Sequence, residues 1–298
     1  MPAARLSSRQ ITEADFSSIA TLLSRGFPKR KRKFWLAALE QLRSRSPPAG
    51  LPRYGYVLEA DDLKVGVVLV VCSTSQLNDR ASTRCNLSSW YVEPKYHSYA
   101  AMFRSLVIAD DNITYLNISA RPNIWPIIET QGFSRYSNGV FIATPTLRGL
   151  LSSAKVKVFY ASQHPKVDFD LSDQGLLLEH ARYGCISLWC ATPDFAYPFV
   201  FRRRLIKGLI PCAQMIYCRD VAEYVRFAGP IGRFLAMRCM PLVLIDANGP
   251  VPQLVGKFFG DRDQKYFKGP DRPRLGDIAY NEAALWGVYG SLRKAHRH

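Results

Sequence analysis

Hydrophobic residues recur at helical spacing in two segments near the start of the chain. Residues three and four positions apart lie on one face of a helix, so this spacing predicts a helix over 14–27 and a second over 33–45. Gly26-Phe27-Pro28 would end the first of them, because glycine and proline interrupt helices. The apolar faces are formed by Phe16, Ile19, Leu22 and Leu23 and by Trp35, Ala38, Leu39 and Leu42.

The pattern then changes to short apolar runs and alternations that are typical of strands. A hairpin is predicted from 54–60 and 64–72, joined by the polar turn Asp61-Asp62. The complete order predicts an α+β layered domain that ends near residue 145. Its other elements are a strand over 4–10, a strand over 84–92, a helix over 98–108, a strand over 113–119, a short helix over 121–133, and a last hairpin or strand over 134–144.

A similar order of elements begins again in the second half of the chain. Residues 145–165 resemble a connector that contains one strand, and no residue-level repeat accompanies the repeated order. We therefore expect two domains, 1–147 and 148–298. The elements expected in the second are a helix over 171–184, strands over 185–192, 198–206 and 213–218, a helix over 221–240, and a strand over 241–248.

Composition favours a soluble globular protein. Hydrophobic residues make up 48% and charged residues 21% of the 298 residues, which is the balance of a chain that can bury a core. No apolar run approaches the length needed to span a membrane, and the arginines near the N-terminus precede no apolar segment of a secretory signal. The seven cysteines lack metal-ligand spacing and are expected to be reduced, mostly buried thiols in a cytoplasmic protein.

The formal net charge of +16 is distributed along the chain, with 19 basic against 11 acidic residues in 1–150 and 21 against 13 in the rest. Basic residues concentrate in PKRKRK at 28–33 and RRR at 202–204. Such clusters either form solvated surfaces or contact a phosphate-bearing ligand or RNA.

Two segments resemble the GNAT acyltransferase superfamily: NLSSWYVEPKYHSYAAMF at 86–103 and YLNISARPNIWPIIETQGFSRYSNGVFI at 115–142. In that family a strand ending in Val-x-Pro is followed by a Gln/Arg-x-x-Gly-x-Gly/Ala turn that opens a helix, and a later short helix ends in Gly-Phe. Val92, Pro94 and Gly132-Phe133 match this pattern. The resemblance implies tandem GNAT-like domains, each a mostly antiparallel mixed sheet flanked by helices, with the second domain degenerate.

The resemblance also implies a site for acetyl-CoA or another acyl-CoA. In the family, backbone N–H groups of the turn bind the coenzyme A diphosphate at the helix start. His97 stands at the Gln/Arg position, Ala100 at the first glycine and Met102 at the second glycine or alanine. The cofactor-binding residues expected by this alignment are Trp90, Val92, His97, Ser98, Tyr99, Ala100, Ala101, Met102 and Asn117.

The usual proton-transfer residues of the family are replaced in this chain. Ile128 stands where relatives often have a tyrosine acid, and Asn86 stands where some have a carboxylate. Tyr91, Tyr99 and Glu93 are the alternative catalytic candidates, although the tyrosines could instead serve packing and Glu93 could be solvated. Trp125 would either line an acyl or acceptor pocket or belong to the core. No metal site is expected.

Three functions remain open from the sequence. The first is acyl-CoA-dependent transfer of an acetyl or longer acyl group to an amine. The second is acyl-CoA binding without turnover. The third resembles tandem GNAT-like aminoacyl-tRNA-dependent transferases, in which the acyl donor is carried on RNA and a glycine-rich turn is dispensable; the net charge of +16 favours it modestly.

Overall fold

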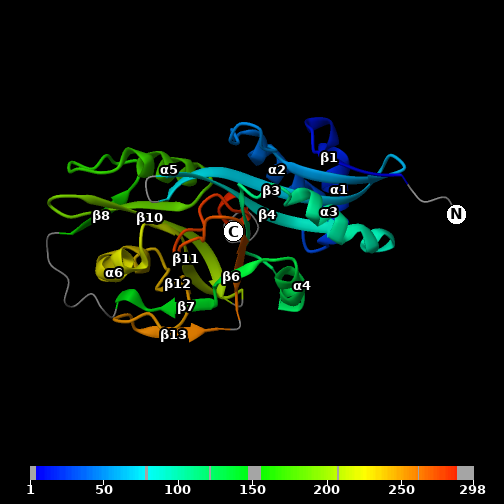
Figure 1. Ribbon diagram of the computed structural model, residues 1–298. Helices are drawn as coiled ribbons and strands as arrows, with labels where there is room; N and C mark the ends of the chain where they lie inside the picture. The colour runs from blue at the N-terminus through cyan, green and yellow to red at the C-terminus, as the bar shows by residue number, and fades with distance from the viewer. Residues whose placement is uncertain are drawn as a thin grey trace, which may run out of the picture. The chain divides into compact units, whose positions relative to one another are not determined.

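The computed structural model describes residues 5–77, 80–120, 122–146, 156–206, 208–260 and 262–286. Contacts divide the chain into two compact units (Figure 1). The first unit contains residues up to Ile118 together with Phe267–Arg272 and Tyr280–Glu282, and the second contains the remainder. The expected domain boundary at 147–148 lies outside the described residues and stays a prediction.

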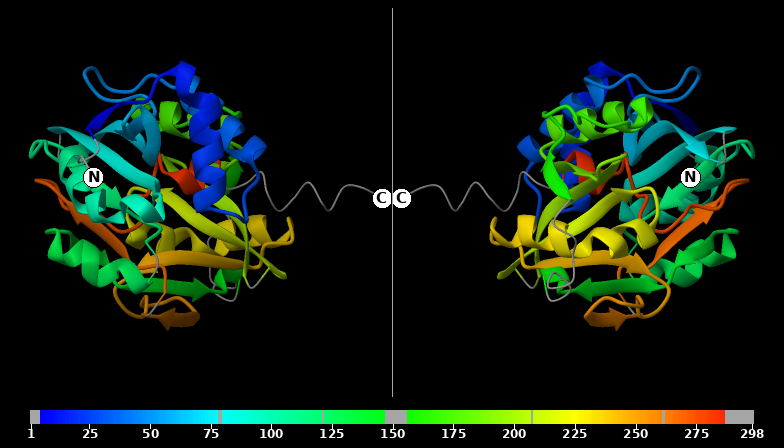
Figure 2. Two further views of the ribbon diagram at one scale, coloured as in Figure 1. Left: turned by 90° about the vertical axis from the view of Figure 1, so that its right-hand side faces the viewer. Right: turned by 90° about the vertical axis from the view of Figure 1, so that its left-hand side faces the viewer.

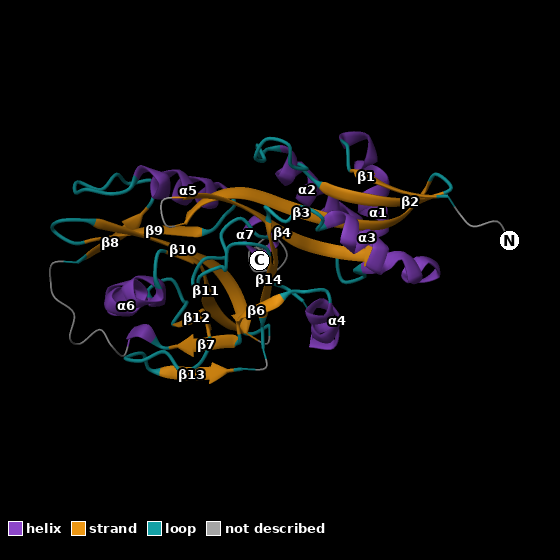
Figure 3. Cartoon of the chain, in the orientation of Figure 1, coloured by secondary structure: helices purple, strands orange, loops and turns teal. Residues whose placement is uncertain are grey.

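The first unit has a sheet in the strand order β1-β2-β3-β4-β5, of which β1 to β4 are labelled in Figure 3. The pairing is antiparallel except between β4 and β5. The predicted hairpin is confirmed, and Asp61 and Asp62 both have positive φ, as a tight two-residue hairpin turn requires. The bounds are β1 Leu6–Gln10, η1 Glu13–Asp15, α1 Phe16–Gly26, α2 Arg32–Arg43, β2 Gly55–Ala60, β3 Leu63–Leu77, β4 Arg80–Val92, η2 Pro94–Tyr99, α3 Ala100–Val107 and β5 Thr114–Asn117.

Helices α1 and α2 form the two N-terminal elements expected from the sequence. Their apolar faces are buried as predicted, with Ile19, Leu23 and Leu39 fully inaccessible. Val65 and Val67–Cys72 of β3 are at most 2% exposed. A continuous apolar run of this kind indicates a strand that is covered on both faces.

The cysteine prediction is wrong for one pair. Cys72 and Cys85 are joined by a disulfide between opposite positions of β3 and β4. Four of the other five cysteines are buried as expected, and Cys239 is exposed. Burial raises the pKa of the Cys185 and Cys190 thiols to about 12, so these two groups are poor nucleophiles.

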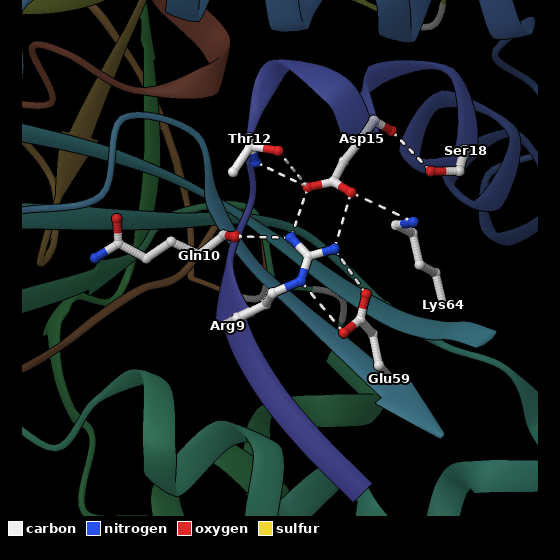
Figure 4. A network of polar contacts seen from close by, with 7 residues as sticks. All are labelled: Arg9, Gln10, Thr12, Asp15, Ser18, Glu59 and Lys64. Carbon is white, nitrogen blue, oxygen red and sulfur yellow. Dashed lines mark hydrogen bonds and ion pairs between the residues drawn. The ribbon is translucent and has the colours of Figure 1, made fainter. Parts of the chain in front are cut away.

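A network of ion pairs fixes the start of α1 against the sheet (Figure 4). Arg9 donates to both oxygens of Asp15 at 2.7 and 2.9 Å, and to Glu59 at 2.7 Å. The Asp15 carboxylate also accepts from the backbone N–H of Thr12 and lies 3.3 Å from Lys64 Nζ. The hydrogen bond from Arg9, with help from Thr12, lowers the pKa of Asp15 well below its ordinary value.

Asp15→Asn is expected to lower the free energy of unfolding by about 1–3 kcal/mol at pH 7, because it breaks charged hydrogen bonds at a buried group. Since the folded-state pKa of Asp15 is depressed, its contribution is complete above the unfolded value of about 4. It is lost as the pH falls toward the folded-state pKa. Urea unfolding at pH 7 and pH 3 would therefore show a smaller effect at pH 3. Asp62→Asn, the same change in an exposed turn, is the control and should shift stability by less than about 0.5 kcal/mol.

The second unit contains a sheet in the order β13-β7-β12-β11-β10-β9-β8. Helix α6 covers one face of it (Figure 2), where Tyr224, Ile231 and Leu235 are buried in a common core with Phe199 and Val243. The bounds are η3 Pro122–Ile124, α4 Trp125–Thr130, β6 Ser134–Ser137, β7 Gly139–Ala143, β8 Lys157–Tyr160, α5 Leu171–Arg182, β9 Ile186–Ala191, β10 Ala196–Ile206, β11 Ile210–Cys218, α6 Val221–Ala236, β12 Leu242–Ala247 and β13 Gly256–Phe259.

Some elements differ from the predictions. For 134–144, where a hairpin or one strand was expected, the structure instead has two strands, β6 and β7, and β7 pairs with β12 and β13. Beyond residue 248 the sequence predicted no elements, whereas the structure has β13, β14 (Lys265–Lys268) and α7 (Glu282–Leu285). Within the described part of the chain, no helix is both long and apolar enough to cross a membrane.

Candidate functional site

The end of β4 has an irregular backbone. Val67 pairs with Tyr91 and Leu69 with Ser88, so two residues of β4 lie opposite Val68. Ser89, one of the two, has a φ of 52°, which is uncommon for a residue with a side chain. This arrangement is a β-bulge, and a bulge bends the strand that carries it.

The parallel pairing of β4 with β5 stops before that bulge. It comprises three pairs, from Arg84 with Thr114 to Asn86 with Leu116. Residues Leu87–Val92, which we call the free edge of β4, continue past the last pair, whereas β5 ends at Asn117. Within the described part of the chain, backbone N–H groups on the β5 side of this edge have no partner in β5, which makes them candidate donors for a ligand.

The residues aligned with the diphosphate turn lie in two consecutive helical elements. His97, Ser98 and Tyr99 end the 3₁₀ helix η2, and Ala100, Ala101 and Met102 begin α3. The backbone N–H of Ala100 donates to the carbonyl of His97. His97 also directs its ring to the protein, because its Nε2 lies 2.9 Å from the Val92 carbonyl oxygen, and a carbonyl can only accept. These donors are engaged within the first unit.

Met102, which stands at the second glycine position of the family turn, is 42% exposed and does not fill the core. Ser98 and Ala101 are also exposed. Helix α3 lacks a side-chain cap, since Tyr99 occupies the N-cap position without a capping hydrogen bond, and its first turn has no acidic residue.

The three catalytic candidates make different contacts. Tyr91 packs against α1 so closely that a Cβ at Gly26 would lie 2.4 Å from its ring, which favours a packing role. Glu93 forms an ion pair with Arg25 at 2.7 Å. Tyr99 is half-buried at the start of α3. Tyr99 is thus the candidate with the fewest competing contacts among the described residues.

Of the other residues expected to bind the cofactor, Trp90 and Val92 belong to the free edge of β4 and Asn117 ends β5. Trp90 contacts the buried ring of Phe103 at 5.2 Å, and the Arg104 guanidinium lies 4.9 Å above the Trp90 ring. Burial lowers the pKa of Arg104. Val92 is buried, and Asn117 is half-buried as the last residue of β5. Ile128, which stands where the family often has a tyrosine acid, belongs to α4 of the second unit and is 2% exposed.

One polar contact was not expected from the sequence. Asn86, at the last pair before the free edge of β4, donates from Nδ2 to the carboxylate of Glu282. Both residues belong to the first unit, although they are 196 positions apart. A carboxylate therefore lies beside Asn86 of β4.

In the second unit, the junction between β11 and α6 corresponds to the junction between β4 and α3. Its strand pairing is similar, but acidic side chains occupy the start of its helix. Its register shifts between Val200 and Phe201, and β11 makes three parallel pairs with β12. However, Asp220 caps α6 by accepting from the N–H of Ala222, and Glu223 lies in the first turn. These carboxylates would repel an anion at this helix start.

Buried polar residues fill the same end of β11. Asp173 accepts from the hydroxyl of Tyr217 at 3.0 Å and from Nε of Arg219 at 2.7 Å. Burial raises the pKa of Asp173, and Arg219 opposes this effect. The two junctions thus share strand geometry, but only the first presents a strand edge without an acidic cap beside it.

Of the two basic clusters, 28–33 includes the exposed residues Lys29, Lys31 and Lys33. In 202–204, Arg204 is half-buried and pairs with Asp263 at 2.9 Å. Within the described ranges, no group of three or more His, Cys, Asp or Glu side chains could hold a metal ion.

Several solved structures have the same fold. A GCN5-related N-acetyltransferase from Anabaena variabilis is 9% identical, with a TM-score of 0.55 over 88% of this chain and 72% of that chain. One from Kribbella flavida is 13% identical, with a TM-score of 0.53 over 89% and 71%. A probable N-acyltransferase from Enterococcus faecalis is 9% identical, with a TM-score of 0.56 over 92% and 73%.

No protein-family model matches the sequence, and no curated protein matches it significantly. The similarity to solved structures shows the fold alone. The chain has the tandem GNAT-like α+β fold, with mixed, mostly antiparallel sheets flanked by helices, and the predicted fold class is confirmed.

Proposed function

We propose that the protein is an acyl-CoA-dependent N-acyltransferase whose first unit binds the thioester along the free edge of β4. The observation that carries this proposal is the bulge at Ser89 together with the end of β4–β5 pairing at Asn86. Backbone N–H groups of Trp90–Val92 would polarise the thioester carbonyl, since donors fixed in a strand need no reorganisation during the reaction. Asn117 would contact the pantetheine arm, and the diphosphate would lie at Ser98–Met102.

In this proposal the amine nitrogen attacks the thioester carbon, a C–N bond forms and the C–S bond breaks. Glu282 accepts the proton that the amine loses, and Tyr99 donates a proton to the departing thiolate. Asn86 orients the Glu282 carboxylate through its hydrogen bond. A positioned general base of this kind contributes roughly 10²–10⁴-fold to the rate.

Calorimetry with acetyl-CoA and with longer acyl-CoAs tests the binding step. We expect one binding site per chain, because the second junction is capped by Asp220 and followed by Glu223. Two equivalent sites would contradict the assignment to the first unit, and no binding of any thioester at millimolar concentration would remove the proposal.

Release of free thiol with a panel of amines then tests turnover. Binding without thiol release would support the non-catalytic alternative.

A second candidate is transfer from an aminoacyl-tRNA. It is favoured by the engagement of the Ala100 N–H within the helix, which removes a donor that a diphosphate would use, and by the exposed lysines of 28–33. Retention of tRNA that weakens steeply with added salt would support this candidate, because binding that neutralises phosphates releases counterions. Indifference to RNA at low salt would count against it.

A further inference from the structure

A pocket of about 390 Å³ lies within the second unit, on the sheet face opposite α6. This volume falls in the range of small-molecule sites, roughly 300–1,000 Å³. The pocket shares no residue with the free edge of β4. Ile142 of β7, Leu244 of β12 and Ile206 of β10 line it, and the indole of Trp125 forms another part of its wall. Trp125 is fixed there by the hydrogen bond from its Nε1 to the Ala120 carbonyl at 3.0 Å.

The polar part of the pocket carries an excess of positive charge. Arg204, Arg262 and Asp263 line it, so two guanidinium groups face one carboxylate. Arg204 uses Nη1 to bind Asp263 and Gln214. Its Nε and Nη2 have no partner among the described residues. Arg262 stacks 5.1 Å above the Phe259 ring, and no described carboxylate pairs with it.

A buried ion pair holds this polar part in place. Lys265 is 1% exposed, and its Nζ lies 2.5 Å from Asp246 Oδ1 and 3.1 Å from the Asp263 carbonyl oxygen. Lys265 therefore anchors the backbone of Asp263, while Arg204 holds the Asp263 side chain. A site whose polar groups are fixed before binding loses less entropy when a ligand arrives.

We propose that this pocket binds a monocarboxylate with an apolar body. The apolar body lies against Trp125, Ile142 and Ile206, and the carboxylate accepts hydrogen bonds from Arg204 and Arg262. Guanidinium groups match a carboxylate in geometry as well as in charge. A cationic ligand of the same size is disfavoured by the net positive charge of the pocket.

The test uses octanoate, octanol and octylammonium, which share one apolar tail and differ in charge. Ligand-observed NMR titration of the full chain should show saturable binding of octanoate. Octanol and octylammonium should bind at least tenfold more weakly. Equal affinity for octanoate and octanol, or no binding of octanoate, would overturn the proposal.

Two variants locate the binding. Arg262→Glu reverses a charge at an exposed position and should weaken octanoate binding at least tenfold. Its control is Arg203→Glu, the same change at an exposed residue of β10. Because successive side chains of a strand point to opposite faces, Arg203 points away from the face that Arg204 occupies. The control should leave the affinity for octanoate within twofold of the wild type.

Ile142→Trp fills the pocket and should abolish octanoate binding while far-UV circular dichroism stays unchanged. Unaltered binding in either pocket variant would refute the site.

Discussion

Glu282→Gln is expected to lower the rate of thiol release by roughly 100-fold or more with the most active amine, because it removes the group proposed to accept the amine proton. The glutamine keeps the size of the side chain. Affinity for acyl-CoA, measured by calorimetry, should stay within about twofold of the wild type, since the carboxylate would act on the amine. A loss confined to turnover is the result of removing a base, whereas a loss of binding would indicate a different role.

The contact between Asn86 and Glu282 offers an exchange control. In the double variant Asn86→Asp/Glu282→Gln, the amide and the carboxylate change places and the hydrogen bond between them can re-form. If Glu282 provides a base, the exchange should restore part of the activity, because a carboxylate is then present at the neighbouring position on β4. If Glu282 is only structural, the exchange would restore stability without activity, and the catalytic assignment would be wrong.

Periodicity predicted the elements whose patterns are local. The apolar face of α1 and the continuous run in β3 identify a helix and a buried strand without knowledge of the rest of the chain. The two-residue turn at Asp61 and Asp62 similarly fixes the hairpin of β2 and β3. Even α6 was predicted, although Pro230 lies inside it, because its apolar periodicity continues on both sides of the proline.

Pairing over long sequence distances was not predictable in the same way. No local pattern indicates that β7 joins β12 or that Glu282 reaches Asn86. The four-residue elements β13, β14 and α7 are too short to produce a clear period. The disulfide involves two strands that were both expected, 64–72 and 84–92. Antiparallel pairing of these strands would have brought Cys72 close to Cys85, but the sequence did not indicate that they pair.

For the candidate site, too, the positions of residues were predicted but their hydrogen bonding was not. Of the residues expected from the resemblance, Trp90 and Val92 belong to the free edge of β4, and Asn117 ends β5. The resemblance did not indicate that η2 would continue into α3 and engage the N–H of Ala100. Whether the Ala100 N–H is free for a ligand depends on one backbone hydrogen bond. The sequence pattern does not determine that bond where alanine and methionine replace glycine.

Lys265→Met is expected to lower the free energy of unfolding by about 3–5 kcal/mol, because it leaves the buried Asp246 without its partner. Burial raises the pKa of Asp246, and Lys265 opposes that effect. In the variant the folded state therefore takes up a proton at higher pH than the unfolded state. Stability should then fall as the pH rises through this interval, so urea unfolding should show a larger loss at pH 8 than at pH 5.

Two further variants separate the ion pair from general effects of the substitution. Lys257→Met is the same change at an exposed position of β13 and should cost less than about 0.5 kcal/mol. Asp246→Leu in the Lys265→Met background removes the unpaired carboxylate and should recover most of the lost stability, because an apolar pair can replace a buried ion pair. A double variant less stable than Lys265→Met would contradict this account. Since Lys265 also anchors Asp263, the recovered double variant should still bind octanoate more weakly than the wild type, which makes Lys265 a positioning residue of the pocket.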